Sequence, residues 1–166
     1  SKVSNEERAA VNNFIDNDLR LDASSKEAAR RVFEAALVNG GTVEYYTSNS
    51  NITIPTTSQI TGITLNQYNN LKLTHSGSYA VILPNTDLTI HNDLTVNGSG
   101  TGSARNNNTL SRTIKVNHDL IVNSGLLEYR NNQLTTFRVL NRMTIESGGS
   151  FSVLNGGTAR DNVLEL

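Results

Sequence analysis

Two pairs of residues at matching positions are the strongest candidates for chemistry in this sequence. Asp93 and Asp119 each stand directly before a short apolar strand. His91 and His118 lie in nearly equivalent links between strands. Stacked carboxylates could contact a cation or a carbohydrate, and two imidazoles on adjacent turns could bind a metal. The third position equivalent to the carboxylates is Arg142, however, and no third ligand is in register with the histidines. We therefore expect turn residues that hydrogen-bond their own backbone, with no metal and no cofactor.

Amides and aromatic rings are the next candidates. Asn92, Asn117 and Asn141 lie in equivalent links and are predicted to form a turn ladder of stacked side-chain amides. A sugar-stacking face could be built from tyrosines, but their scattered positions favour packing: Tyr45, Tyr46, Tyr68, Tyr79 and Tyr129. The motifs GxGxxG, HExxH and GxSxG do not occur. We expect no catalytic residue.

Composition excludes several classes of function. The chain has 166 residues, a net charge of −1 and only 17% charged residues, so no basic field points to nucleic acid. Cysteine is absent, which leaves no disulfide framework and no thiolate metal site. No apolar run approaches the roughly 18 residues of a membrane span, so membrane insertion is not expected. Residues 1–7 show no secretion signal, which indicates either use without a cleaved signal or a signal already removed.

A repeated sequence pattern places these candidate residues at equivalent positions. It occurs four times as an alternating strand that recurs every 23 to 26 residues, at Leu71–Leu73, Leu94–Val96, Leu120–Val122 and Met143–Ile145. A second strand precedes the last three, at Leu88–Ile90, Ile114–Val116 and Phe137–Val139. This period is typical of a coil that stacks on itself. The sequence therefore predicts a mainly β fold, a short parallel β-helix (β-solenoid) of four or five coils. A β-sandwich is the alternative, because short alternating strands suit it too.

The stretch 98–112 interrupts the repeats. It is rich in Gly, Ser and Asn, and it is predicted to be a polar loop without strand character that accounts for the longer 26-residue step. Loops that leave one side of a stack are where repeat proteins place contacts. We therefore expect partner contacts at Arg105, Asn106, Asn107, Asn108 and Arg112.

The N-terminal residues 1–41 are predicted to form a helical arm and cap, followed by the solenoid domain at 42–166. Ser4 and Ser24 each begin a capping box, and apolar residues recur at helical spacing over 28–37. Gly40 and Gly41 would end the second helix. The tail after Thr158 is expected to add a last edge strand at 163–166.

Residues 25–63 resemble a known family. Ser25–Ala29 leads through Ala35 and Ala36 to Gly40–Val43 and then to Ile54-Pro55. This pattern resembles the start of right-handed parallel β-helices of the pectate lyase and bacteriophage tailspike kind. The resemblance implies an amphipathic helix that caps the first coil. Catalytic members have many more coils and stacked acidic pairs, so no catalytic residue is carried over to this chain.

These observations lead us to expect a non-catalytic structural or adhesive protein of a virion. The expected types are a bacteriophage fibre, a tailspike-like protein or a capsid decoration protein. Because nothing comparable to the helical cap covers the C-terminal end of the stack, we expect a homotrimer, with other virion proteins and host surface polysaccharide as partners. One alternative is an extracellular adhesin module on a bacterial surface. The other is a polysaccharide lyase or glycosidase fragment that would use Asp93, Asp119, Glu128 and Glu146.

Overall fold

Alternating apolar and polar residues form fourteen strands in the part of the chain that the structure, a computed structural model, describes: residues 2–4, 40–56, 65–106, 112–130, 135–154 and 163–166. The strands are β1 Lys2–Ser4, β2 Thr42–Thr47, β3 Ile52–Thr53, β4 Gln67–Tyr68, β5 Asn70–His75, β6 Ala80–Ile82, β7 Leu88–Ile90, β8 Leu94–Gly98, β9 Ser103–Arg105, β10 Arg112–Val116, β11 Asp119–Arg130, β12 Thr135–Val139, β13 Arg142–Leu154 and β14 Val163–Glu165. The helices predicted within residues 5–39 lie outside the described residues.

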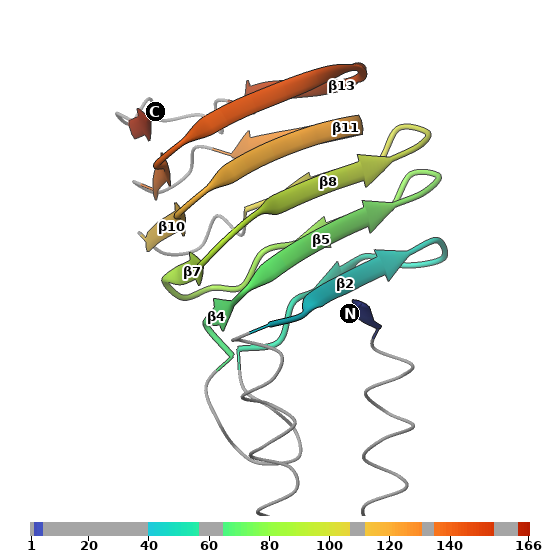
Figure 1. Ribbon diagram of the computed structural model, residues 1–166. Coiled ribbons are helices and arrows are strands. Elements are labelled where there is room, and N and C mark those ends of the chain that lie inside the picture. The colour runs from blue at the N-terminus through green and yellow to red at the C-terminus, as the bar shows by residue number, and fades with distance from the viewer. Residues whose placement is uncertain (1, 5–39, 57–64, 107–111, 131–134, 155–162) are drawn as a thin grey trace, which may run out of the picture.

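The strands build a parallel β-solenoid of about four turns. Wall A consists of β2, β5, β8 and the first parts of β11 and β13, which lie one above another in Figure 1. Wall B consists of β3, β6, β9 and the second parts of β11 and β13, and wall C of β4, β7, β10, β12 and β14. Neighbouring strands in every wall pair in parallel, coil on coil. The chain thus forms the predicted solenoid and not the alternative sandwich.

The register confirms the repeats read from the sequence. Leu71 pairs with Leu94, Leu94 with Leu120, and Leu120 with Met143. On wall C the equivalent positions also align, at Leu88, Ile114 and Phe137. These side chains point inward and stack into one core, in which Leu71, Leu94, Leu120 and Ile114 are each 0% exposed. Burial of each such side chain contributes about 1.5–3 kcal/mol, which stabilises one coil on the next.

The prediction that residues 98–112 form a loop without strand character is wrong for the middle of this stretch. Ser103–Arg105 forms β9, which pairs with β6 and with the second part of β11. Its one inward side chain, Ala104, is small and fully buried against Val81 and Leu127. A strand with a single inward alanine has no apolar alternation, and that is why the sequence pattern failed here. The longer step arises between β9 and β10, where residues 107–111 lie outside the described part.

A short edge strand lies at each end of the solenoid, β1 on wall A and β14 on wall C. β1 pairs with β2, so Lys2–Ser4 adds an edge strand to wall A that the sequence analysis did not predict. At the other end, β14 pairs with β12, which confirms the expected strand after residue 162.

The division into an arm at 1–41 and a solenoid at 42–166 stays a prediction. Within the described residues, no helix has the length and apolar character needed to cross a membrane.

Candidate functional site

One corner of the solenoid, where wall C turns into wall A, carries the aspartate and histidine pairs singled out in the sequence. Asn70, Asp93, Asp119 and Arg142 occupy the position directly before the first inward residue of wall A in successive coils. We call these four residues the corner ladder. The backbone N–H of Asp93 donates to Asn70 Oδ1 at 3.2 Å, and that of Asp119 donates to Asp93 Oδ1 at 3.1 Å. Each side-chain oxygen therefore satisfies a backbone group of the next coil.

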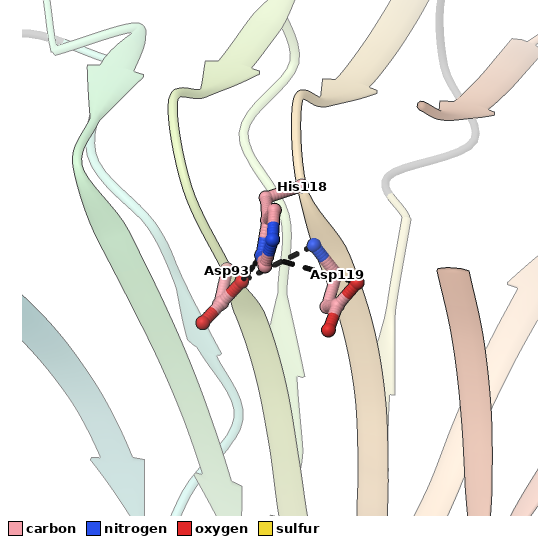
Figure 2. Close-up of side chains that lie close together, drawn as sticks. All are labelled: Asp93, His118 and Asp119. Atoms are coloured by element: carbon pink, nitrogen blue, oxygen red, sulfur yellow. Dashed lines mark hydrogen bonds and ion pairs between the residues drawn. The ribbon is translucent and has the colours of Figure 1, made fainter. Parts of the chain in front are cut away.

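A second donor reaches each of these oxygens from the preceding residue of the next coil. Asn92 Nδ2 donates to Asn70 Oδ1 at 2.8 Å. In the following coil, His118 Nδ1 lies 2.6 Å from Asp93 Oδ1. Figure 2 shows the His118 ring between the two carboxylates of Asp93 and Asp119, with its nitrogen directed at Asp93. The histidine thus takes the place that an asparagine amide takes one coil earlier.

Asp119 is the most enclosed residue of the ladder, with its side chain 5% exposed. Asn141 Nδ2 donates to its Oδ1 at 2.7 Å, and Arg142 Nη2 donates to its Oδ2 at 2.7 Å. Both carboxylate oxygens therefore have charge-assisted partners from the next coil.

The structure corrects two details of the sequence interpretation. Asp93 was expected to hydrogen-bond its own backbone, but it binds the backbone of the next coil. Asn117 was expected in one amide ladder with Asn92 and Asn141, but the register places His118 in that row and Asn117 one position earlier. His91, in the row of Asn117, contacts Gln67 Oε1 at 3.0 Å. The two histidines thus lie in different rows, which removes the paired-imidazole interpretation.

With His118 between Asp93 and Asp119, and Arg142 after them, charges of opposite sign alternate along this corner. The hydrogen bond to Asp93 raises the pKa of His118 above its usual value, and the nearby Asp119 carboxylate acts in the same direction. The hydrogen bond from Arg142 holds the pKa of Asp119 below its usual value, and the amide of Asn141 adds to this effect. Protonated His118 is therefore favoured between two carboxylates, while Arg142 balances the second of them.

A metal ion is the obvious alternative use of these donors. One atom each from Asp93, His118 and Asp119 lie within 4.8 Å of one another. Binding through these atoms would require loss of the hydrogen bond between His118 and Asp93. It would also bring a cation close to the guanidinium of Arg142, which binds Asp119. The donor set fits an ion-pair ladder better than a metal centre, and we assign no metal to it.

The outward face of wall A adjoins the ladder. An open hollow of about 360 Å³ lies on it, lined by Thr42, Asn70, Leu71, Lys72, Asp93, Thr95, Asn97 and Asn123. Asn70 and Asp93 belong to both features, so the ladder forms one edge of the hollow. Its lining is mostly amides and hydroxyls, which can both donate and accept hydrogen bonds.

Contacts between coils hold this face in place. Lys72 Nζ lies 3.0 Å from Glu44 Oε1, and Thr74 Oγ1 donates to the same carboxylate oxygen at 2.7 Å. Two coils further on, Asn123 Nδ2 donates to Asn97 Oδ1 at 3.1 Å. The polar groups of the face are therefore fixed on rigid strands, which favours a defined binding surface.

The residues predicted to form a contact loop lie in several environments. Arg112 is only 5% exposed, begins β10 and donates from Nη1 to the carbonyl oxygen of Pro84 at 2.8 Å. Asn106 is also buried, and Arg105 ends β9 in a half-buried position. Asn107 and Asn108 lie outside the described residues. The described members thus belong to the stack itself and are not exposed.

Most tyrosines pack in the core, as the sequence favoured. The rings of Tyr45 and Tyr68 meet edge to face, with their hydroxyl oxygens 3.0 Å apart. Tyr129 meets Phe137 in the same geometry. Tyr79 is only half-buried, and Tyr46 is 55% exposed on the outward side of β2. This ring lies on the same wall as the hollow.

His75 is a buried residue that the sequence analysis missed. It is 1% exposed, and the N–H of Leu126, two coils away, donates to its Nε2 at 3.4 Å. The imidazole lies against Gly98 and Gly125, where a Cβ atom would come within 2.0 Å and 2.7 Å of Nε2. Burial lowers the pKa of His75. The signal in the sequence was the glycine that follows the repeated strand in later coils.

Comparison with known proteins gives no relative. No protein-family model matches the chain, and searches of curated proteins and of solved structures also find no match. The solenoid fold is therefore shown by the structure alone.

Proposed function

We propose that the protein is a non-catalytic structural or adhesive β-solenoid that contacts a polysaccharide through the outward face of wall A. One observation carries this proposal. The carboxylates at the corner are engaged in hydrogen bonds between coils, whereas the adjoining hollow presents amides and hydroxyls to solvent. Acidic groups held in this way serve the stack. Asn97 and Asn123 bind each other through one oxygen and one nitrogen, so Asn97 Nδ2 and Asn123 Oδ1 remain for a ligand, together with the hydroxyls of Thr42 and Thr95.

The chemistry of the face suits a sugar chain. Tyr46 pairs in register with Thr74, which pairs with Asn97, and Asn97 accepts a hydrogen bond from Asn123. An exposed ring, a hydroxyl and two amides thus follow one another across four coils. An aromatic ring offers an apolar surface at low entropic cost, while amides match sugar hydroxyls as donors and acceptors.

The parallel stack also suits an elongated ligand. Equivalent outward positions repeat from strand to strand at a spacing of about 4.8 Å. A polysaccharide laid across the strands would meet similar groups at regular intervals, so several weak contacts would add up along one chain.

The second part of the proposal concerns location. We propose that this surface belongs to a bacteriophage particle, as a fibre, a tailspike-like protein or a decoration protein. Support comes from the resemblance of residues 25–63 to tailspike-type β-helices. Probing purified virions with an antibody against the protein tests this part. A signal on bacterial cell surfaces and none on particles would favour the adhesin module instead.

Binding is tested with purified protein and a panel of bacterial surface polysaccharides. We expect retention of at least one polysaccharide, and about a tenfold weaker affinity for the variant Asn97→Ala/Asn123→Ala, which removes both amides. Lys115→Ala on wall C is the matched control, because Lys115 is a half-buried residue of β10, outside wall A. Release of new reducing ends during the assay would contradict the non-catalytic function.

A further inference from the structure

Four inward positions of the last coil are exposed, unlike their counterparts one coil earlier. The counterparts in the preceding coil are almost fully buried, with exposed fractions of 0% for Val122, 3% for Tyr129, 2% for Phe137 and 1% for Val139. In the last coil the exposed fractions are Ile145 48%, Val153 53%, Leu164 41% and Leu166 76%. Register relates Val122 to Ile145, Tyr129 to Val153 and Phe137 to Leu164, and Leu166 follows two residues later, as Val139 does. All three walls thus present core-type side chains at one end.

The same end offers unpaired backbone. β13 is 13 residues long and pairs with β11 on one side, and no described strand pairs with its other side. β14 likewise pairs only with β12 among the described strands. In Figure 1, β13 is the uppermost strand of its wall. Open N–H and C=O groups beside exposed apolar side chains make a template for another strand.

We propose that a second copy of this chain covers this end, so that two solenoids associate tail to tail about a twofold axis. A head-to-tail arrangement is disfavoured because it would set the 13-residue β13 against β1, the described edge strand at the other end of wall A, which has only three residues. Two identical last coils have the same cross-section, so the apolar ends match in size. A twofold contact also closes on itself and leaves no further copy to add.

Charge complementarity supports this pairing and defines its register. In an antiparallel pair of β13 strands centred on Thr144, Arg142 would face the partner's Glu146, and Met143 would face the partner's Ile145. Arg142 is 68% exposed although it binds Asp119, and Glu146 is exposed. Each charge pair would form twice across the axis, and oppositely charged residues directly across a ladder stabilise it.

The same axis brings the remaining apolar side chains together. An axis through the middle of wall A places wall B of one copy on wall C of the other. Phe151 and Val153 would then pack against the partner's Leu164 and Leu166. Side chains that are now partly or largely exposed would enter one continuous core, as their counterparts do between the preceding coils.

Mass in solution is the first test, measured by light scattering and by sedimentation at several protein concentrations. We expect twice the 18.0 kDa of one chain. Ile145→Asp should weaken the association at least about 100-fold, because it places a charge in the apolar interface. Tyr46→Ser is the control, since Tyr46 is equally exposed but lies on the first coil, and it should leave the dimer intact. Circular dichroism shows whether each variant is folded.

A charge exchange tests the register independently. In Glu146→Lys, each new lysine would face the partner's Arg142. In Arg142→Glu, each new glutamate would face the partner's Glu146. Both variants would place like charges opposite each other twice, so both should be monomers. Mixed together, they should form a heterodimer in which every facing pair is attractive. Because Arg142 also binds Asp119, circular dichroism must first show that Arg142→Glu is folded. Failure of the two folded variants to associate would overturn the register, and a wild-type monomer would overturn the interface. A mass of three chains would support the trimer expected from the sequence and overturn the pairing.

Discussion

His118 Nδ1 lies 2.6 Å from Asp93 Oδ1, a contact between two coils in which a histidine takes the place of an asparagine. One coil earlier, Asn92 makes the corresponding bond to Asn70. One coil later, Asn141 makes it to Asp119. An amide makes this bond at any pH, whereas the imidazole makes its strongest bond when it is protonated. In the row formed by Asn92, His118 and Asn141, His118 is therefore the one donor that is itself titratable.

We predict that His118 makes part of the folding stability pH-dependent. Its pKa is raised in the folded state, so its stabilising contribution is fully present below the unfolded value of 6.5. This contribution is lost as the pH rises through the higher folded pKa. The Tm should therefore contain a component that falls as the pH rises above about 6.5. The variant His118→Asn restores the amide of the neighbouring coils and should lack this component; an unchanged profile would contradict the assignment.

His75 should act in the opposite direction. Its pKa is lowered by burial, and its Nε2 accepts a hydrogen bond from the N–H of Leu126. The folded state thus favours the neutral ring, and stability should fall as the pH drops below the unfolded value of 6.5. Thermal unfolding of His75→Gln between pH 5 and pH 7 measures this effect. We expect a flatter profile than in the wild type, and an equally steep one would show that another group is responsible.

Replacement of Gly98 by alanine should be costly because of His75. The added Cβ would lie 2.0 Å from Nε2 of the buried imidazole, so the ring would have to move and lose its bond from Leu126. We expect a loss of about 1–3 kcal/mol in the free energy of unfolding. Gly148→Ala is the matched control, since its Cβ would come no closer than 3.3 Å to another atom.

A second substitution separates this clash from a general effect on the strand. Removal of the ring in Gly98→Ala/His75→Ala should recover part of the stability lost in the single glycine variant. Urea unfolding of the four proteins forms a double-mutant cycle. Strictly additive losses would show that the two positions do not interact.

The sequence predicted the stack well and its cross-coil polar contacts poorly. The apolar positions Leu71, Leu94 and Leu120 repeat at a nearly constant interval, so their alignment followed from the period alone. β9 was missed because its inward residue is only an alanine. β1 was also missed, because three residues carry no period and their partner β2 lies about 40 residues away in sequence.

At the candidate site, the sequence predicted the positions of the polar residues but not the partners of their hydrogen bonds. Asp93 and Asp119 were correctly placed at equivalent turns, but their bonds join different coils. Whether an aspartate bonds its own turn or the next coil depends on the stacking distance, which a one-dimensional pattern does not contain. His91 and His118 differ by one position in register, and that single step gives them different partners.

The cost of an apolar truncation should depend on the coil in which it is made. Leu73, Val96, Val122 and Ile145 occupy one inward row, and only the last of them is exposed. Leu73→Ala removes a fully buried side chain and should cost about 2–5 kcal/mol. Ile145→Ala removes one that is 48% exposed in a single chain, and it should cost less than about 1 kcal/mol at low protein concentration.

Protein concentration then distinguishes an uncovered end from a paired one. If a second copy covers Ile145, the dimer adds its own stability, which grows with the concentration of the chain. The difference in Tm between wild type and Ile145→Ala should therefore widen as the concentration is raised, while the difference for Leu73→Ala stays constant. Differential scanning calorimetry over a hundredfold range of concentration provides the comparison. Parallel behaviour of the two variants would mean that the last coil faces water in solution and that its exposed side chains are not an interface between copies.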